Sequence, residues 1–298
     1  MASTAPAPAG SAGHRAPHRK VTMAHATPAP LHDPSGTGPG PTSDLWQETG
    51  RALSFGRAAD QYDTARPGYP PVLFETVERE LGRPLRGADT VDVGAGTGIA
   101  TRLLVDRGAR VVAVEPGDGM AARFRRTLPG TPVVRAIGDR LPLADHSADL
   151  ITYAQSWHWT DPRRALPEAL RVLRPGGALA LWWNTADRTV PWIAAQSERL
   201  VERLGNDTLG APGNARRLPD GAPASVLHSL RWTRDIPLDT HLANIGSHSA
   251  FLTADPQAAD DALRRERTEL LRLFPDGRIT EEYTVLLTVM PAPRNTAR

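Results

Sequence analysis

The stretch Val91-Asp-Val-Gly-Ala-Gly-Thr-Gly98 decides the fold class, because an apolar strand passes here into a helix through three closely spaced glycines. Glycine adopts positive φ angles at little cost and lets a ligand approach the backbone closely. A turn that binds a dinucleotide has Gly or Ala at its sixth position, where this chain has Ile99. The acid Asp92 precedes the first glycine, and its carboxylate suits a cationic amino group better than a pyrophosphate. The motif therefore disfavours a nicotinamide-dependent oxidoreductase, although an ordinary strand-to-helix turn also fits the three glycines alone.

Outward from this motif, from Trp46 onward, short apolar strands alternate with amphipathic helices of 9–13 residues. Such alternation predicts an α/β fold with a doubly wound parallel sheet and helices on both faces, whose ligands bind at the carboxyl ends of the strands. The predicted strands are 90–94, 110–115, 132–137, 149–153, 178–183, 230–237 and 282–289, and the predicted helices are 55–62, 72–81, 99–107, 120–128, 163–173, 192–204 and 256–274.

Composition excludes several classes of protein. Residues 1–44 are rich in Ala and Pro and show no apolar periodicity, so we expect a disordered tail. The tail and the remainder of the chain each carry a net charge of +1, which leaves no basic surplus for binding a nucleic acid. The longest apolar run, Ala178–Trp183, is far shorter than the roughly 20 residues that span a membrane. The absence of Cys fits a cytoplasmic protein and excludes thiolate metal sites.

Polar residues follow three of the predicted strands. Glu115 ends the second strand, where an acid accepts hydrogen bonds from a ribose diol; the alternative is a surface acid before a turn. Asp139 follows the third strand and could accept from an adenine amine, or could be a solvated turn residue. Gln155-Ser-Trp-His-Trp159 follows the fourth strand, and its two Trp residues fit either a binding site or core packing.

Several further motifs complete a resemblance. They are Val114-Glu-Pro-Gly117, Leu141-Pro-Leu143 with Ser147-Ala-Asp149, Arg171-Val-Leu-Arg-Pro-Gly-Gly177, Phe55-Gly-Arg-Ala-Ala-Asp-Gln-Tyr62 and Arg66-Pro-Gly-Tyr69. Over about residues 53–205 the chain resembles the class I S-adenosylmethionine-dependent methyltransferases, in the small-molecule branch that includes methyltransferase type 11 and trans-aconitate-type enzymes. The resemblance implies a Rossmann-like, mostly parallel sheet of seven strands, with a helical lid over residues 45–82, a cofactor-binding core over 83–190 and acceptor-pocket elements over 191–298.

The resemblance also implies the residues that hold S-adenosylmethionine. Around the methionine and ribose these are Gly94, Ala95, Gly96 and Gly98, with Asp92 at the amino group, Glu115 and Pro116 at the ribose hydroxyls, Gln155 at the methionine part, and Tyr62 and Arg66 near the carboxylate. Around the adenine they are Met120, Asp139, Arg140 and Leu141. Many relatives have a Gly-Asp-Ala-Glu segment before the Leu-Pro step, whereas this chain keeps one acid there, Asp139.

Catalysis then needs an acceptor next to the sulfonium methyl group. The faces of Trp157 and Trp159 could stabilise the cation, and His158 is a candidate general base; it could instead orient the acceptor or simply pack. The segment His241–Leu252 is pocket lining or surface. We see no tight acid cluster for a metal after the fifth strand. The expected activity is methyl transfer to an O, N or C atom of a small molecule, in keeping with secondary metabolism, and a non-catalytic S-adenosylmethionine-binding module is the alternative.

Overall fold

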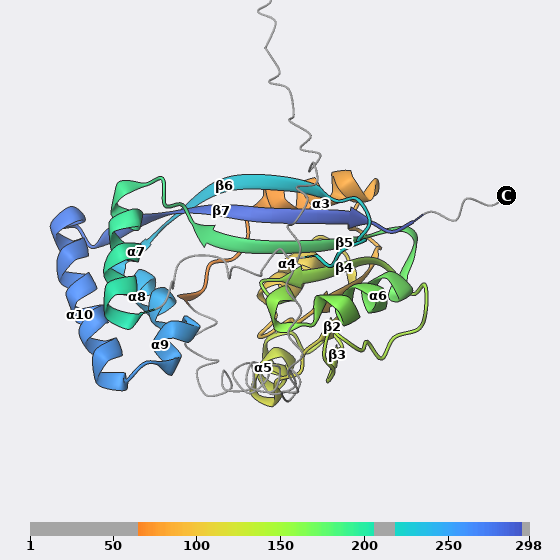
Figure 1. Ribbon diagram of the computed structural model, residues 1–298, viewed down its shortest axis with the longest axis horizontal. Coiled ribbons are helices and arrows are strands. Elements are labelled where there is room, and N and C mark those ends of the chain that lie inside the picture. The colour runs from red at the N-terminus through yellow and green to blue at the C-terminus, as the bar shows by residue number, and fades with distance from the viewer. Residues whose placement is uncertain (1–64, 206–217, 294–298) are drawn as a thin grey trace, which may run out of the picture. The chain divides into compact units, whose positions relative to one another are not determined.

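The computed structural model describes residues 65–205 and 218–293, which contain a seven-stranded sheet (Figure 1). The strand order is β3-β2-β1-β4-β5-β7-β6, and β7 runs antiparallel to both of its neighbours. The predicted seven-stranded, mostly parallel sheet is thus confirmed. In chain order the strands are β1 (Asp89–Val93), β2 (Arg110–Val114), β3 (Val133–Val134), β4 (Ala148–Ala154), β5 (Leu173–Ala186), β6 (Val226–Pro237) and β7 (Arg278–Pro291).

Helices lie on both faces of the sheet, as the alternation predicted. The 3₁₀ turn η2 (Trp157–Trp159) follows β4. The described helices are α3 (Pro71–Leu81), α4 (Ile99–Asp106), α5 (Asp118–Thr127), α6 (Pro162–Val172), α7 (Pro191–Leu204), α8 (Leu238–Gly246), α9 (Ser249–Thr253) and α10 (Pro256–Leu273).

Alternation along β5 assigns each helix to a face, because successive side chains of a strand point to opposite sides. Ala180 and Trp182 pack with side chains of α3 and α4, whereas Leu181 and Trp183 pack with side chains of α6. Both faces of β5 are therefore buried, as in the centre of a doubly wound sheet. The helix α3, which we assigned to the lid, packs on the sheet through Phe74 and its neighbours.

Four helices gather beside the ends of the long strands β6 and β7 (Figure 1). Helices α7, α8 and α10 share one apolar cluster with Phe251 of α9 and Ile279 at the start of β7. In α10 the Asp255 carboxylate accepts hydrogen bonds from the amides of Gln257 and Ala258, which begins the helix. This cluster closes the sheet at the end where the parallel strands finish.

The lengths of several strands depart from the prediction. The predicted strand 132–137 shortens to the two residues of β3, which pairs only with β2. The fifth and seventh strands are much longer than predicted, because β5 and β7 pair with each other from Ala178–Pro291 to Ala186–Tyr283. Local apolar periodicity carries no information about such long-range pairing.

Some sequence expectations lie outside the described residues. They are the disordered tail 1–44, the motif Phe55–Tyr62 with its predicted helix, and the lid before residue 65. Within the described ranges, we find no helix that is both long enough and apolar enough to cross a bilayer. In the same ranges, no three acidic or His side chains are grouped closely enough to hold a metal ion.

Candidate active site

The glycine turn joins β1 to α4 at the carboxyl end of the sheet. Gly94, Gly96 and Gly98 all have positive φ angles, of 68°, 58° and 98°. A Cβ atom at Gly94 would collide with the Ser156 side chain, and one at Gly98 would lie 2.6 Å from a Leu128 methyl carbon. A Cβ atom at Gly96 would meet nothing within 4 Å. Gly94 and Gly98 are thus required for packing inside the protein, and Gly96 is the glycine of this turn that lies against open space, where a ligand fits.

Glu115 connects this turn to the next one. Its Oε2 accepts a hydrogen bond from the Gly96 amide at 2.8 Å, and its Oε1 accepts one from the Gly117 amide at 2.7 Å. Burial raises the pKa of Glu115, and the two amide hydrogen bonds oppose that shift. Each carboxylate oxygen keeps a second lone pair. A ribose diol at Gly96 could therefore donate to the same carboxylate, and the residues present fit the predicted nucleoside.

Asp92 does not face that space. Its side chain is fully buried, and its two oxygens accept hydrogen bonds from Thr101 Oγ1 at 2.6 Å and Thr152 Oγ1 at 2.8 Å. Burial raises the pKa of Asp92 to about 6, although both hydroxyls act in the opposite direction. This geometry does not provide the predicted direct contact between Asp92 and the amino group of S-adenosylmethionine. Asp92 instead ties β1 to α4 and β4 beneath the glycine turn, because its side chain points into the protein.

The predicted adenine residues divide into buried and exposed groups. The amide of Leu141 donates to Glu168 Oε2 at 2.9 Å and its side chain lies in the core, so Leu141 faces the protein rather than a base. Asp139 is partly buried, its pKa is raised by that burial, and its Oδ1 accepts from the Asp161 amide at 3.1 Å. Arg140 is exposed and lines an open pocket of about 680 Å³ beside this segment.

Two further predicted cofactor residues, Pro116 and Met120, follow Glu115 in the chain. Met120 is buried in the first turns of α5, directly after the Glu115 turn. The Pro116 carbonyl accepts a hydrogen bond from Arg135 Nη2 at 2.6 Å, which fixes the backbone beside Glu115. Both residues follow Glu115, which is hydrogen-bonded to Gly96. Their contacts with the cofactor stay predictions.

Gln155 occupies a strained position after β4. Its φ angle is 56°, a region that residues other than Gly rarely adopt and that is often found at functional sites. Its amide donates to the Trp182 carbonyl at 2.8 Å, and its Nε2 donates to the Tyr69 hydroxyl at 3.3 Å. The next residue, Ser156, donates to the Val93 carbonyl at 2.5 Å. Gln155 is thereby held beside the glycine turn.

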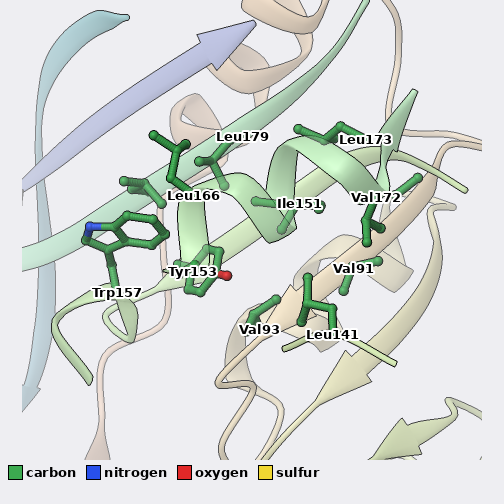
Figure 2. Close-up of a cluster of buried hydrophobic side chains, with 14 of the residues drawn as sticks. Val91, Val93, Leu141, Ile151, Tyr153, Trp157, Leu166, Val172, Leu173 and Leu179 are labelled. Atoms are coloured by element: carbon green, nitrogen blue, oxygen red, sulfur yellow. The ribbon is translucent and has the colours of Figure 1, made fainter. Parts of the chain in front are cut away.

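Trp157 is a core residue. It is fully buried, lies edge-on to Tyr153 with ring centroids 4.9 Å apart, and packs near Leu166 (Figure 2). The packing alternative therefore holds for Trp157, and not the predicted contact with the sulfonium or acceptor. Its side chain lies on the face of the sheet that α6 covers. Trp159 is only partly buried, and its ring centroid lies 4.6 Å from that of His158.

His158 is held in one tautomer. The Trp183 indole N–H can only donate, and it lies 3.4 Å from His158 Nδ1. His158 Nδ1 therefore accepts, and the ring proton is on Nε2. Burial lowers the pKa of His158 to about 4, so the ring is neutral at pH 7. A ring in this state offers a hydrogen-bond donor through Nε2 and is a weaker base than an ordinary histidine.

Arg66 and His241 lie farther along the same end of the sheet. Arg66 donates through Nε to Ser247 Oγ at 2.9 Å and through Nη2 to the Ser247 carbonyl at 3.0 Å. These hydrogen bonds tie the segment before α3 to the end of α8. His241 is buried, with Nδ1 2.6 Å from Glu281 Oε1. The surface alternative is therefore wrong for His241, because α8 turns it toward the buried Glu281 of β7, and the pocket-lining alternative for the segment stays a prediction.

Sequence reasoning missed several residues of this site. Ser156 follows Gln155 directly and fills the space left by Gly94, and Tyr69 bonds Gln155. Thr101 and Thr152 hold Asp92. Asp92 itself was the available signal for the threonines, since a carboxylate in a buried strand needs hydrogen-bond donors. Nothing in the sequence signals that Tyr69 reaches Gln155, because 86 residues separate them.

Comparison with known proteins identifies a family and several relatives. The family described as "Methyltransferase domain" matches residues 91–181, from β1 to within β5. An uncharacterized methyltransferase of Mycobacterium tuberculosis is 39% identical over 225 residues, which cover 75% of this chain and 88% of that protein. A malonyl-[acyl-carrier protein] O-methyltransferase of Methylococcus capsulatus is 37% identical over 153 residues, which cover 47% of this chain and 54% of that protein.

A solved structure shares the fold. It is a proposed type II methyltransferase from Anaeromyxobacter dehalogenans, with a TM-score of 0.60 and 26% identity, covering 77% of this chain and 99% of that one. The glycine turn at Gly96 and the carboxylate of Glu115 fit the donor that such enzymes use. The chain belongs to the class I S-adenosylmethionine-dependent methyltransferases, and S-adenosylmethionine is its cofactor.

Proposed function

We propose that the protein transfers the methyl group of S-adenosylmethionine to an oxygen atom of a small-molecule acceptor. The observation that carries the proposal is the burial of side chains at the strand ends, among them Trp182, Tyr283 and Asn244. Arg66 ties the segment before α3 to the same end through its hydrogen bonds to Ser247. Binding among buried side chains favours a small acceptor over a polymer.

The cofactor supplies a sulfonium methyl group that is already electrophilic, so the protein mainly has to align an acceptor with it. Gly96 and Glu115 would hold the nucleoside, and Gln155 would lie at the methionine part. His158 would donate a hydrogen bond through its Nε2–H group to an oxygen of the acceptor and thereby orient the acceptor. The carboxylate of an acid is already nucleophilic and needs no base, in keeping with a histidine whose pKa is low. The Methylococcus relative is named an O-methyltransferase, which describes transfer to an oxygen.

The test measures S-adenosylhomocysteine release when the protein is incubated with S-adenosylmethionine and a panel of small carboxylic acids, phenols, amines and enols. We expect release with an acid or phenol and none with amines. The Gly96→Val variant is the control, because it should not bind the cofactor. Cofactor binding by titration calorimetry without release on any panel member would instead support the non-catalytic binding module.

His158 gives a separate prediction once an acceptor is known. If His158 orients the acceptor, His158→Ala should raise KM about 10-fold or more and lower kcat only modestly, because a charged hydrogen bond is lost on binding. The pH profile of kcat should show no limb near pH 6.5 in the wild type, since the pKa of His158 lies near 4. Steady-state kinetics across pH 5–9 check both expectations.

A second variant separates the two roles of His158. His158→Gln offers an N–H donor but no titrating base, so it should restore much of the wild-type KM if orientation is the role. A general base predicts the opposite: both variants would lose kcat by about 10²–10⁴-fold together with the limb of the pH profile. Equal kinetics and a lower melting temperature in both would show that His158 only packs.

A further inference from the structure

Where β4 ends, strand β5 presents two side chains with N–H groups, Trp182 and Asn184, on the face that α3 and α4 cover. Ala154, the last residue of β4, pairs with Trp182, and β5 continues through Asn184 to Ala186. Trp182 and Asn184 are two residues apart and thus point to the same face. We call the group formed by Tyr69, Trp182, Asn184, Trp232, Asn244 and Tyr283 the strand-end cluster.

Hydrogen bonds and ring contacts connect members of this cluster. Trp232 Nε1 donates to Asn184 Oδ1 at 2.9 Å, and the Trp232 ring stacks on Tyr283 with centroids 5.2 Å apart. Asn244 Nδ2 donates to the Tyr283 hydroxyl at 3.0 Å. The Tyr69 ring lies edge-on to Trp182, with centroids 5.7 Å apart. The cluster therefore consists of aromatic rings from three strands and from the segment before α3, with two asparagines among them.

Two contacts of the cluster reach Gln155: the Tyr69 hydroxyl accepts a hydrogen bond from its side chain, and the Trp182 carbonyl accepts one from its backbone amide. The next residue, Ser156, fills the space left by Gly94 in the cofactor turn. The methyl group of the cofactor must lie at this end of the sheet, because ligands of such sheets bind beyond the carboxyl ends of the strands. An acceptor that contacts the strand-end cluster would thus be within reach of the methyl group.

Three buried polar atoms of the cluster have no hydrogen-bond partner within the described part of the chain: Trp182 Nε1, Asn184 Nδ2 and Asn244 Oδ1. The orientation of the Asn184 amide is fixed, because the Trp232 indole can only donate and therefore faces the Asn184 oxygen. Buried polar groups are normally paired, and leaving them unpaired reduces stability. Three such atoms in one cluster indicate that a polar ligand completes it.

We propose that Trp182 Nε1 and Asn184 Nδ2 bind a carboxylate oxygen of the methyl acceptor, and that the aromatic rings of the strand-end cluster pack on a planar, unsaturated body. Two N–H donors on one strand face complement an oxygen that carries negative charge. Flat aromatic rings favour a planar partner over a bulky saturated one. The inference deepens the proposed function, because it names a planar carboxylic acid as the class of acceptor.

The test uses three probes of one shape: cinnamate, cinnamyl alcohol and β-methylstyrene. Titration calorimetry measures their affinity for the full chain saturated with S-adenosylhomocysteine. We expect cinnamate to bind at least 10-fold more tightly than the hydrocarbon, with the alcohol between them. Equal affinity for the acid and the hydrocarbon, or no binding of cinnamate, would overturn the proposal.

Two variants assign that preference to the named atoms. Asn184→Asp keeps the oxygen that accepts from Trp232 and replaces the unpaired donor by an acceptor, so it should weaken cinnamate binding at least 10-fold and leave β-methylstyrene unchanged. Trp182→Phe should weaken cinnamate binding about 5- to 10-fold. Trp192→Phe is the matched control, because Trp192 packs on His241 and Phe274 instead. Unchanged cinnamate affinity in both cluster variants would refute the assignment.

The experiment also separates this inference from the proposed function. All variants should keep wild-type affinity for S-adenosylhomocysteine, which shows that they are folded and that the cofactor site is intact. If cinnamate binding depends on Asn184 but no panel acid is methylated, the site stands and the proposed activity fails. If acids are methylated while Asn184→Asp and Trp182→Phe bind them normally, the activity stands and the strand-end cluster is not its acceptor site.

Discussion

Gly96→Val should abolish the binding of S-adenosylmethionine, with an increase in Kd of more than 100-fold, and leave the fold intact. A Cβ atom at this position enters open space, so the new side chain would occupy volume that the ligand needs without colliding with the protein. The positive φ of 58° adds strain for a β-branched residue, of about 1–2 kcal/mol. Titration calorimetry and thermal unfolding measure the two effects.

Gly82→Val is the matched control for that strain. Gly82 follows α3, has a φ of 74°, and a Cβ atom there would also meet nothing within 4 Å. The control should therefore lose similar stability and keep wild-type affinity for the cofactor. Wild-type affinity in Gly96→Val would show that the turn is only a structural connection. If Gly82→Val lost cofactor binding to the same extent, the effect would be due to reduced stability of the fold.

Glu115→Ala should weaken both S-adenosylmethionine and S-adenosylhomocysteine about 10- to 150-fold. Removing a charged contact to a diol costs about 1.5–3 kcal/mol, which corresponds to that range. The amides of Gly96 and Gly117 also lose their common acceptor, so the two turns are no longer tied together. Calorimetric titration of a folded variant with both ligands checks the expectation.

Glu115→Gln is the isosteric control. Its single amide oxygen can accept from one of the two turn amides, so we expect a loss of affinity smaller than that of the Ala variant. The raised pKa of Glu115 predicts that wild-type affinity also falls as the pH is lowered, from a higher pH than for an ordinary carboxyl, and that this dependence is absent in Glu115→Gln. Unchanged affinity in both variants would remove Glu115 from the ribose site.

The elements that the sequence predicts well are those set by local pattern. The turn from β1 to α4, the alternation of strands and helices, and the position of Glu115 after β2 all follow from apolar periodicity and from glycines within a few residues of one another. The helix predicted at 192–204 differs from α7 by a single residue at its start. Such features need only neighbouring residues, because backbone propensity and strand or helix period act locally.

The direction of each site side chain needed the tertiary structure. Asp92 and Glu115 are both acids at strand ends, yet Asp92 points inward to Thr152, 60 residues away, whereas Glu115 joins the two glycine turns. Trp157 and Trp159 are two residues apart in one motif, and only Trp157 is buried in the core. A strand end or short turn can present a side chain to either side, and distant segments determine which.

The amino-acid sequence by itself thus determined the fold class, the cofactor turn and the family, because these depend on residue types at short, regular spacing. Only the tertiary structure decided that His158 keeps its proton on Nε2, through Trp183 on the neighbouring strand. It also decided that Asn184 accepts a hydrogen bond from Trp232, and that the buried Trp182 Nε1 and Asn184 Nδ2 have no hydrogen-bond partner within the described residues. Hydrogen-bond pairing between segments tens of residues apart depends on the packed arrangement, and no local pattern encodes it.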